Sequence, residues 1–135
     1  MGMDKQHFAI DRKYDRIDTE IPCRLGLPGD RQCDAMVLNL SVGGLKLACN
    51  HETFASIIPA AQRTPGQVSD VRVTVKFSLR PISRRAMNLQ FDGMVVHSER
   101  LAQDNYHIGV QFTGMRKADI NRLEDYIDEI VAARN

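Results

Sequence analysis

Arg12 and Arg16 are the residues near the start of the chain whose type and spacing suit ligand chemistry. Three residues separate them in the run Asp11-Arg-Lys-Tyr-Asp-Arg16. Each guanidinium presents a planar fork of donors that can clamp a phosphate through two hydrogen bonds or lie flat on a purine ring. The alternative is a solvated arm in which these arginines form weak surface ion pairs with Asp11 and Asp15.

A second candidate site is the run Asn39-Leu-Ser41-Val-Gly-Gly44, where a strand turns through glycine. Small polar side chains and exposed backbone N–H groups at such a turn suit an anion or the edge of a base. Asn39 and Ser41 would offer the polar atoms, and Gly43 and Gly44 complete the site because a Cβ at Gly44 would intrude on a ligand. The alternative is an ordinary turn, in which Asn and Ser bond the backbone and Gly takes a positive φ.

Alternation of apolar and polar residues predicts the elements that hold these two runs. Ile17 to Leu27 alternates cleanly, which is typical of a half-buried strand, and Pro22 indicates an edge or a bulge. Residues 1–16 have little periodicity and are expected to form an N-terminal ligand-binding arm, while residues 17–135 form one barrel domain with a C-terminal helix. The strands are predicted at 17–27, 32–40, 45–49, 71–79, 87–98 and 106–112.

Six strands with turn signals between them, and no helix of parallel-crossover length, favour a mainly β fold: an antiparallel barrel or closed sheet. Between the third and fourth of these strands, residues 50–70 fit one short helix or a packed loop. Residues 117–134 switch to helical spacing, and this amphipathic helix could cap the barrel, lie against its side or meet a partner. Its apolar face is predicted to hold Ile120, Leu123, Ile127, Ile130 and Val131, and the other face mostly Asp119, Glu124, Asp125, Asp128 and Glu129.

Composition narrows the class of protein. A chain of 135 residues is one domain's worth, and its formal net charge of +1 argues against a dedicated nucleic-acid or membrane-surface protein. Its three cysteines have no C-x-x-C spacing, and no apolar stretch approaches the length of a membrane span. We therefore expect buried thiols in a reducing compartment, the cytoplasm. The histidines show no metal spacing, and no catalytic triad, carboxylate dyad or phosphate loop is present.

The two runs together resemble the PilZ domain family, bacterial receptors for the second messenger cyclic di-GMP. The family pattern is R-x-x-x-R in an N-terminal arm followed by D/N-x-S-x-x-G at a strand-to-strand turn. Arg12 and Arg16 fill the first motif, and Asn39, Ser41 and Gly44 fill the second. Residues 91–96, 107–112 and the C-terminal helix also look like the later elements of the family, so nearly the whole chain is covered.

This resemblance implies a six-stranded PilZ-type β-barrel that grips cyclic di-GMP between the arm and the Asn39–Gly44 turn. It also implies that His97 lies near the ligand and stacks on a guanine, although a half-exposed strand histidine fits equally well. The chain departs from the family at Asp11, a position that is often basic, where an acid removes a phosphate ligand. Asn39 is the neutral form of its Asp/Asn position and lacks a charged acceptor for guanine.

The sequence thus predicts a cyclic di-GMP receptor, not an enzyme, that orders its arm on binding and signals to an unknown protein partner in motility, pilus, biofilm or polysaccharide control. We expect no metal or other cofactor, no nucleic-acid partner, no membrane insertion, and a monomer or weak homodimer. One alternative is a PilZ-fold interaction adaptor with weak or no nucleotide binding. A single-stranded nucleic-acid barrel is disfavoured by the absence of Trp and the near-neutral charge.

Overall fold

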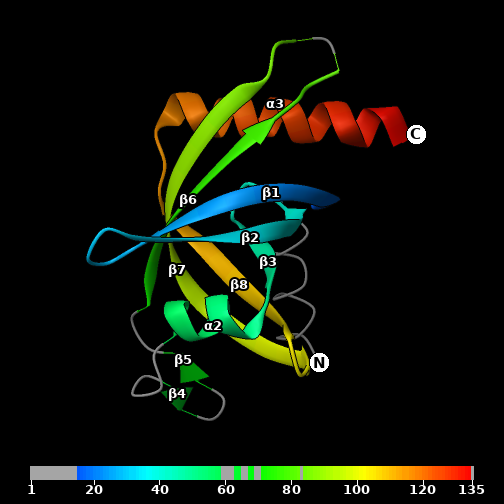
Figure 1. The fold of residues 1–135 in the computed structure, drawn as a ribbon. Coiled ribbons are helices and arrows are strands. Elements are labelled where there is room, and N and C mark those ends of the chain that lie inside the picture. Colours follow the sequence, from blue (N-terminus) through cyan, green and yellow to red (C-terminus); the bar gives the residue numbers. More distant parts are fainter. Residues whose placement is uncertain (1–14, 59–62, 65–66, 69–70, 83, 135) are drawn as a thin grey trace, which may run out of the picture.

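The computed structural model describes residues 15–58, 63–64, 67–68, 71–82 and 84–134. Its main feature is a closed barrel of antiparallel strands, which confirms the predicted six-stranded fold (Figure 1). Around the barrel the strands follow the order β1-β2-β3-β8-β7-β6. Their bounds are β1 Ile17–Leu27, β2 Arg31–Leu40, β3 Gly44–Cys49, β6 Arg72–Leu79, β7 Met87–Ala102 and β8 Asn105–Gly114.

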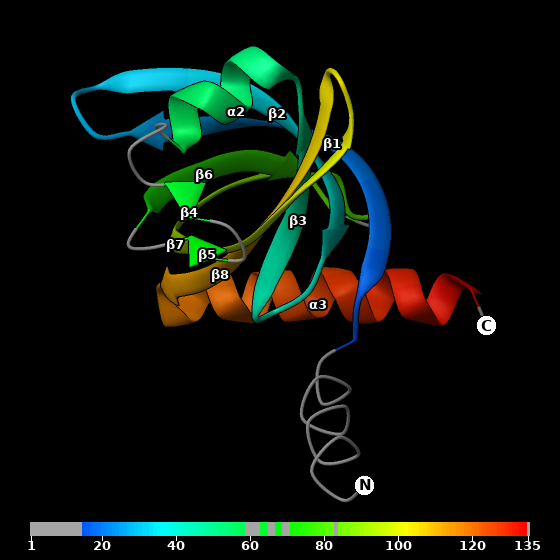
Figure 2. The ribbon, with the colours of Figure 1, turned by 90° about the horizontal axis from the view of Figure 1, so that it is seen from below.

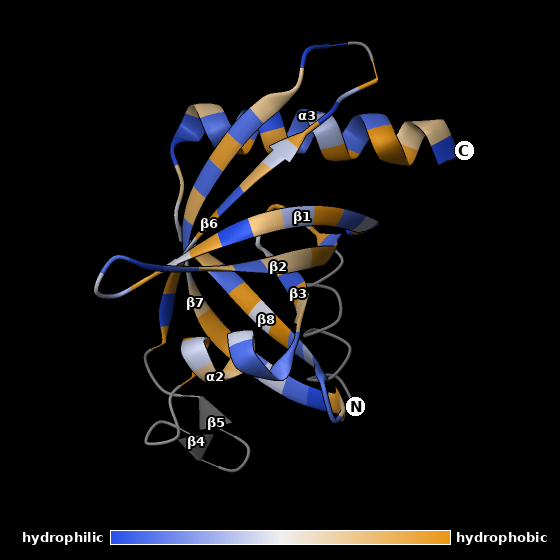
Figure 3. Ribbon diagram, viewed as in Figure 1, coloured by the Kyte–Doolittle hydropathy of each residue, from blue (hydrophilic) through white to orange (hydrophobic). Residues whose placement is uncertain are grey.

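Strand β1 shows how the sequence pattern becomes a barrel wall. Its inward residues are buried or half-buried and its outward residues are mostly exposed, as the period of two predicts. The same alternation is visible along most strands as orange and blue bands (Figure 3). The pairing of β1 with β2 shifts at a bulge between Asp18 and Ile21, directly before Pro22. Pro22 thus lies next to a bulge and on a stretch of β1 that has no β6 partner, which are the settings in which a strand tolerates proline.

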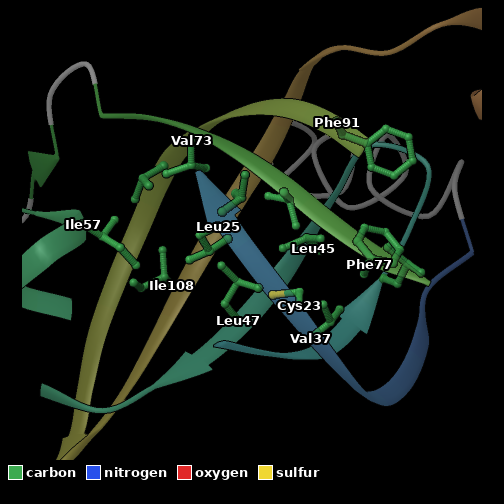
Figure 4. Packing of buried hydrophobic residues seen from close by; sticks show 14 of the residues in the cluster. Cys23, Leu25, Val37, Leu45, Leu47, Ile57, Val73, Phe77, Phe91 and Ile108 are labelled. Atoms are coloured by element: carbon green, nitrogen blue, oxygen red, sulfur yellow. The ribbon is translucent and has the colours of Figure 1, made fainter. Parts of the chain in front are cut away.

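The inward side chains of all six strands fill one apolar core (Figure 4). Phe91 is fully buried and meets Phe77 edge-on, with ring centroids 5.5 Å apart, and Phe112 at 4.7 Å. Cys23 is buried within this core, whereas Cys33 and Cys49 are half-buried and pack against it. Burial raises the pKa of the Cys23 thiol to about 12 and that of Cys49 to about 11. All three cysteines are free thiols.

Two helices close the two ends of the barrel (Figure 2). Helix α2, His51–Ile57, begins at Asn50, whose side chain accepts a hydrogen bond from the Thr53 N–H at 2.8 Å. Its Phe54 ring stacks on Tyr106 of β8, with centroids 4.1 Å apart. Helix α3, Lys117–Arg134, lies across the other end and buries Leu123, Tyr126 and Ile127. Of the three positions left open for the C-terminal helix, the cap is the one observed.

Asp119 corrects the predicted faces of α3. The helical pattern places it on the acidic, solvent-facing side, but Asp119 is only 3% exposed. Its Oδ2 accepts a hydrogen bond from Arg116 Nε at 3.2 Å, and its Oδ1 lies 3.7 Å from Arg122 Nη1. A buried carboxylate is tolerated where cations on the same helix turn neutralise it. The pattern alone could not show this because the neutralising residues are themselves polar.

The segment between β3 and β6 differs most from expectation. It contains α2, as one of the two alternatives proposed, but also a two-stranded hairpin of β4, Arg63–Thr64, and β5, Gln67–Val68, which the sequence did not predict. Strand β7 also runs four residues beyond its predicted end, to Ala102, through three shifts in its pairing with β8. In the described part of the chain, no helix is long and apolar enough to cross a membrane.

Candidate functional site

The β2–β3 turn is held rigid by its own serine. The Ser41 hydroxyl donates to the Gly44 carbonyl at 3.3 Å and accepts from the Gly43 N–H at 3.2 Å, while the Ser41 N–H donates to the same Gly44 oxygen at 2.9 Å. The Phe112 N–H of β8 donates to the Gly43 carbonyl at 3.0 Å and ties the turn to the barrel. The hydroxyl proton of Ser41 is therefore used inside the turn, and one oxygen lone pair remains for a ligand.

Gly44 is required by the barrel itself. A Cβ atom at this position would meet the carbonyl oxygen of Val110 on β8, to which β3 is paired. Among the described residues, positive φ angles occur only at Gly29 and Asp30, so neither glycine of the turn needs the left-handed region. The prediction of a positive φ at this turn is therefore wrong. The close approach of β3 and β8 explains why position 44 is a glycine.

Asn39 belongs to a row of outward-facing residues that crosses five strands. In the barrel register Asp18 pairs with Asn39, Asn39 with Lys46, Lys46 with Gly109, and Gly109 with His97. Residues that pair directly in antiparallel strands point to the same face of the sheet. Within the described chain the Asn39 amide has no hydrogen-bond partner, and Lys46 and His97 are exposed. We call these five residues the outer row.

Gly109 leaves a flat floor between Lys46 and His97 in the outer row. A Cβ built there would lie 3.4 Å from the Cβ of His97, which is ordinary van der Waals contact. The barrel therefore accepts a side chain at this position, in contrast to Gly44. A glycine that packing does not require is often a place where a ligand comes close to the backbone.

The structure brings His97 and Asn39 onto one face but places them apart. Three inter-strand steps separate them, which corresponds to roughly 14 Å at the usual strand spacing. Sequence reasoning missed Asp18, Lys46 and Gly109, which lie before and between these two residues. The alternation of β3 marks Lys46 as outward-facing, but only the register of the barrel shows that it is the neighbour of Asn39.

Arg16 is exposed and directly precedes β1. Asp18, two residues further, pairs with Asn39, so the Arg16 backbone lies beside the outer row. The carbonyl of Asp18 accepts a hydrogen bond from Arg134 of α3 at 3.3 Å, which holds this end of β1. Arg12 lies outside the described residues. In the part of the chain that the structure covers, no cluster of His, Cys, Asp and Glu is suited to a metal ion.

Comparison of the sequence with family models identifies this architecture. The model of the PilZ domain family matches residues 10–129, which include both arginines and the whole barrel. No curated protein sequence matches the chain significantly.

Solved structures from several bacteria have the same fold, and three of them are described here. The inhibitor of motility MotI/DgrA of Bacillus subtilis superposes with a TM-score of 0.66 at 12% identity, over 92% of this chain and 53% of its own. The complex of K. pneumonia MrkH with cyclic di-GMP superposes with a TM-score of 0.65 at 14% identity, over 91% of this chain and 53% of the MrkH chain. The PilZ domain of Escherichia coli YcgR with cyclic di-GMP superposes with a TM-score of 0.59 at 14% identity, over 91% of this chain and 94% of the YcgR domain. This chain thus spans about half of the first two proteins.

Proposed function

This chain belongs to the PilZ domain family, and from that membership we propose that it is a cytoplasmic receptor for cyclic di-GMP that signals to a protein partner. Structures of MrkH and of the YcgR PilZ domain are described as complexes with this dinucleotide, which supports the same ligand here. The proposal assigns the chain a binding function and no catalysis. The partner would belong to motility, pilus, biofilm or polysaccharide control.

The outer row is the observation that carries this proposal. It joins, on one face, a flat glycine floor, a cation and a ring, beside the rigid Ser41–Gly44 turn. Cyclic di-GMP carries two phosphodiester charges and two guanines. Lys46 would face a phosphate, and His97 would stack on a guanine above the Gly109 floor.

The arm supplies the other half of the proposed clamp. Arg16, and Arg12 four residues before it, would bind phosphate or the O6/N7 edge of guanine and stack on its face. Because Arg16 adjoins the end of β1 that Arg134 holds, the arm enters the site from a fixed point. We propose that binding orders the arm and thereby presents a changed surface to the partner.

Asp18 compensates for the neutral Asn39 in this proposal. Its carboxylate lies on the outward face, on the residue directly paired with Asn39. A carboxylate accepts hydrogen bonds from the N1–H and N2–H₂ groups of guanine more strongly than an amide does. Asp18 would therefore read the guanine edge, while Asn39 supports it.

Calorimetric titration of cyclic di-GMP into the full chain is the test. We expect saturable heat for the wild type and at least a tenfold loss of affinity for Arg12→Ala and for Arg16→Ala. Arg72→Ala is the matched control because Arg72 is exposed on β6, the strand farthest around the barrel from β3. Absence of binding heat at high micromolar ligand, with a folded protein, would overturn the proposal.

An adaptor that keeps the fold but binds no nucleotide is the second candidate. The neutral Asn39 and the acidic Asp11 favour it, because each removes a charge that would help to hold the ligand. Recovery of a motility, pilus or polysaccharide-synthesis component equally well by the wild type and by Arg12→Ala/Arg16→Ala protein, together with no calorimetric binding, would select this candidate.

A further inference from the structure

A groove of about 1300 Å³ opens in the barrel wall where β1 and β6 part. Among the described residues, these two strands pair only from Cys23 with Phe77 to Gly26 with Thr74. Before Cys23, β1 has a strand partner only in β2, and after Phe77, β6 has one only in β7. In Figure 1, β6 and β7 rise past α3 and β1 does not follow them. The groove begins where the pairing of the two strands ends, next to the start of α3.

The floor of the groove is apolar and belongs to the edge of the barrel core. A row of inward residues lines it, formed by Ala35, Cys23, Phe77 and Leu89, which pair directly across β2, β1, β6 and β7. Ile21 and Met115, which are partly buried against the core, extend this apolar surface. An apolar group that enters the gap between the strands therefore contacts the core edge, and its removal from water there is favourable.

The next row of residues faces outward and carries charge. It runs through Asp34, Arg24, Lys76 and Gln90, which pair directly across the same four strands. Arg24 and Lys76 thus oppose each other as like charges, which is destabilising for directly paired residues. Arg24 is neutralised by Asp34, with 3.4 Å between Nε and Oδ1, but Lys76 forms no ion pair within the described chain. An anion beside Lys76 would relieve this repulsion.

A second cation lies four residues beyond Lys76. Arg80 is exposed, lines the groove and has no ion pair with any described residue. The two Cα atoms are roughly 13 Å apart along an extended chain, a span that two long side chains can close on one small anion. Between them, Ser78 donates its hydroxyl hydrogen to Asn88 Oδ1, so the NH₂ group of Asn88 has no partner in the described chain and can donate as well.

The other charged groups of the lining are placed differently. Asp119 is buried, and its Oδ2 lies 3.2 Å from Arg116 Nε. Asp92 lies on the side of Lys76 that faces away from Arg80, because it pairs with the β6 residue two positions before Lys76. Lys76 and Arg80 are therefore the two charges of this groove that a ligand would neutralise.

We propose that this groove binds a small amphipathic anion, a long alkyl chain that ends in a carboxylate. The chain would lie on the apolar floor, and the carboxylate would sit between Lys76 and Arg80 and accept a hydrogen bond from Asn88. Small-molecule pockets combine an apolar lining with a few polar groups in roughly 300–1,000 Å³, and this groove offers that lining and enough volume. A fatty acid is the simplest ligand of this class.

This inference goes beyond the proposed nucleotide site and does not depend on it. None of the five residues of the outer row lines the groove. Binding of a fatty acid and binding of cyclic di-GMP can therefore fail separately. Titration of both ligands into the same variants distinguishes the two failures.

Displacement of 11-(dansylamino)undecanoic acid, a fluorescent fatty-acid probe, from the full chain by dodecanoate tests the inference. We expect one saturable site per chain with micromolar affinity. Octanoate should displace the probe at least tenfold more weakly, because its shorter chain buries less apolar surface. Dodecyltrimethylammonium, which has the same alkyl chain and the opposite charge, should not displace it. The Lys76→Gln/Arg80→Gln variant should bind dodecanoate at least tenfold more weakly than the wild type.

Arg72→Gln is the matched control, since Arg72 is exposed on the same strand but does not line the groove. It should bind dodecanoate as the wild type does. Met115→Gln, which makes the floor more polar without changing the charge, should weaken binding of both dodecanoate and the probe. Melting temperatures should confirm that all variants are folded. Absence of saturable binding at high micromolar probe, displacement by dodecyltrimethylammonium, unchanged affinity of the double variant, or an equal loss with Arg72→Gln would each overturn the inference.

Discussion

Gly44 and Val110 approach so closely across β3 and β8 that a Cβ on the glycine would meet the valine carbonyl oxygen. Gly109, one residue away on β8, is paired with Lys46 and has room for a side chain. The same wall of the barrel thus contains one glycine that the fold requires and one that it does not. Substitutions at these two glycines can therefore separate an effect on stability from an effect on ligand binding.

The first prediction concerns Gly44→Ala. The added methyl group must displace the β8 backbone, so the free energy of unfolding should fall by about 1–3 kcal/mol. Chemical denaturation measures this loss, provided that the wild type and the variant have the same m-value. A stability equal to that of the wild type would show that the two strands separate without cost.

Gly109→Ala should behave in the opposite way. Its Cβ makes ordinary contact with His97, and the loss of a flexible glycine changes the free energy of unfolding by no more than about 1 kcal/mol, in the stabilising direction. The methyl group fills the floor of the outer row, so the affinity for cyclic di-GMP should fall about tenfold. Calorimetry and denaturation on the same sample measure both effects. Unchanged affinity would exclude a ligand over Gly109.

Lys46→Glu should weaken cyclic di-GMP binding more than tenfold, because it replaces a phosphate-facing cation by an anion. The salt dependence of the remaining binding should also decrease. Lys76→Glu is the matched control, since it reverses the same charge on β6, three strands around the barrel from β3. If both variants lose affinity equally, net charge rather than the position of Lys46 governs binding.

Asp18 and Asn39 offer a test by exchange. Asp18→Asn should weaken cyclic di-GMP binding because it removes the charged acceptor for guanine. The double variant Asp18→Asn/Asn39→Asp returns one carboxylate to the directly paired position and should recover part of the affinity. An Asp18→Asn variant that binds more tightly than the wild type would show that the carboxylate repels the ligand phosphates instead.

Cys23 predicts a loss of stability at alkaline pH. Because burial raises the pKa of its thiol from 9.0 to about 12, the folded protein keeps this proton where the unfolded chain loses it. The contribution is complete below pH 9 and is lost as the pH rises toward 12, with a slope of at most about 1.4 kcal/mol per pH unit. Denaturation between pH 8 and about 10.5 should show a smaller slope for Cys23→Ala. Equal slopes for the wild type and Cys23→Ala would show that Cys23 does not cause the pH dependence.

Much of the barrel follows from hydrophobic periodicity. The bounds predicted for β1 and α3 agree with the structure, since both elements have long, regular patterns. The hairpin of β4 and β5 was missed because two-residue strands are too short to show a period. The buried Asp119 was missed because its neutralising partners, Arg116 and Arg122, look like ordinary surface residues in the sequence.

The candidate site could be predicted only where its residues are close in sequence. The Ser41–Gly44 turn is one short run, and its pattern was recognisable. Lys46, Gly109 and Asp18 join it through pairings between four different strands. β-Bulges next to Asp18 and Asn39 shift the register of those pairings, and the local hydrophobic pattern of a single strand does not show such shifts.

The hydrogen bond from Arg134 to the Asp18 carbonyl brings the last turn of α3 to the first residues of β1. The described chain therefore starts and finishes at one corner of the barrel. A fluorescent group placed after Arg134 would sit within a few residues of the arm that carries Arg16, and would report its rearrangement directly. By the same geometry, a bulky label at that end would compete with the arm for space, whereas one on the β1–β2 hairpin, at Gly29, would leave it untouched.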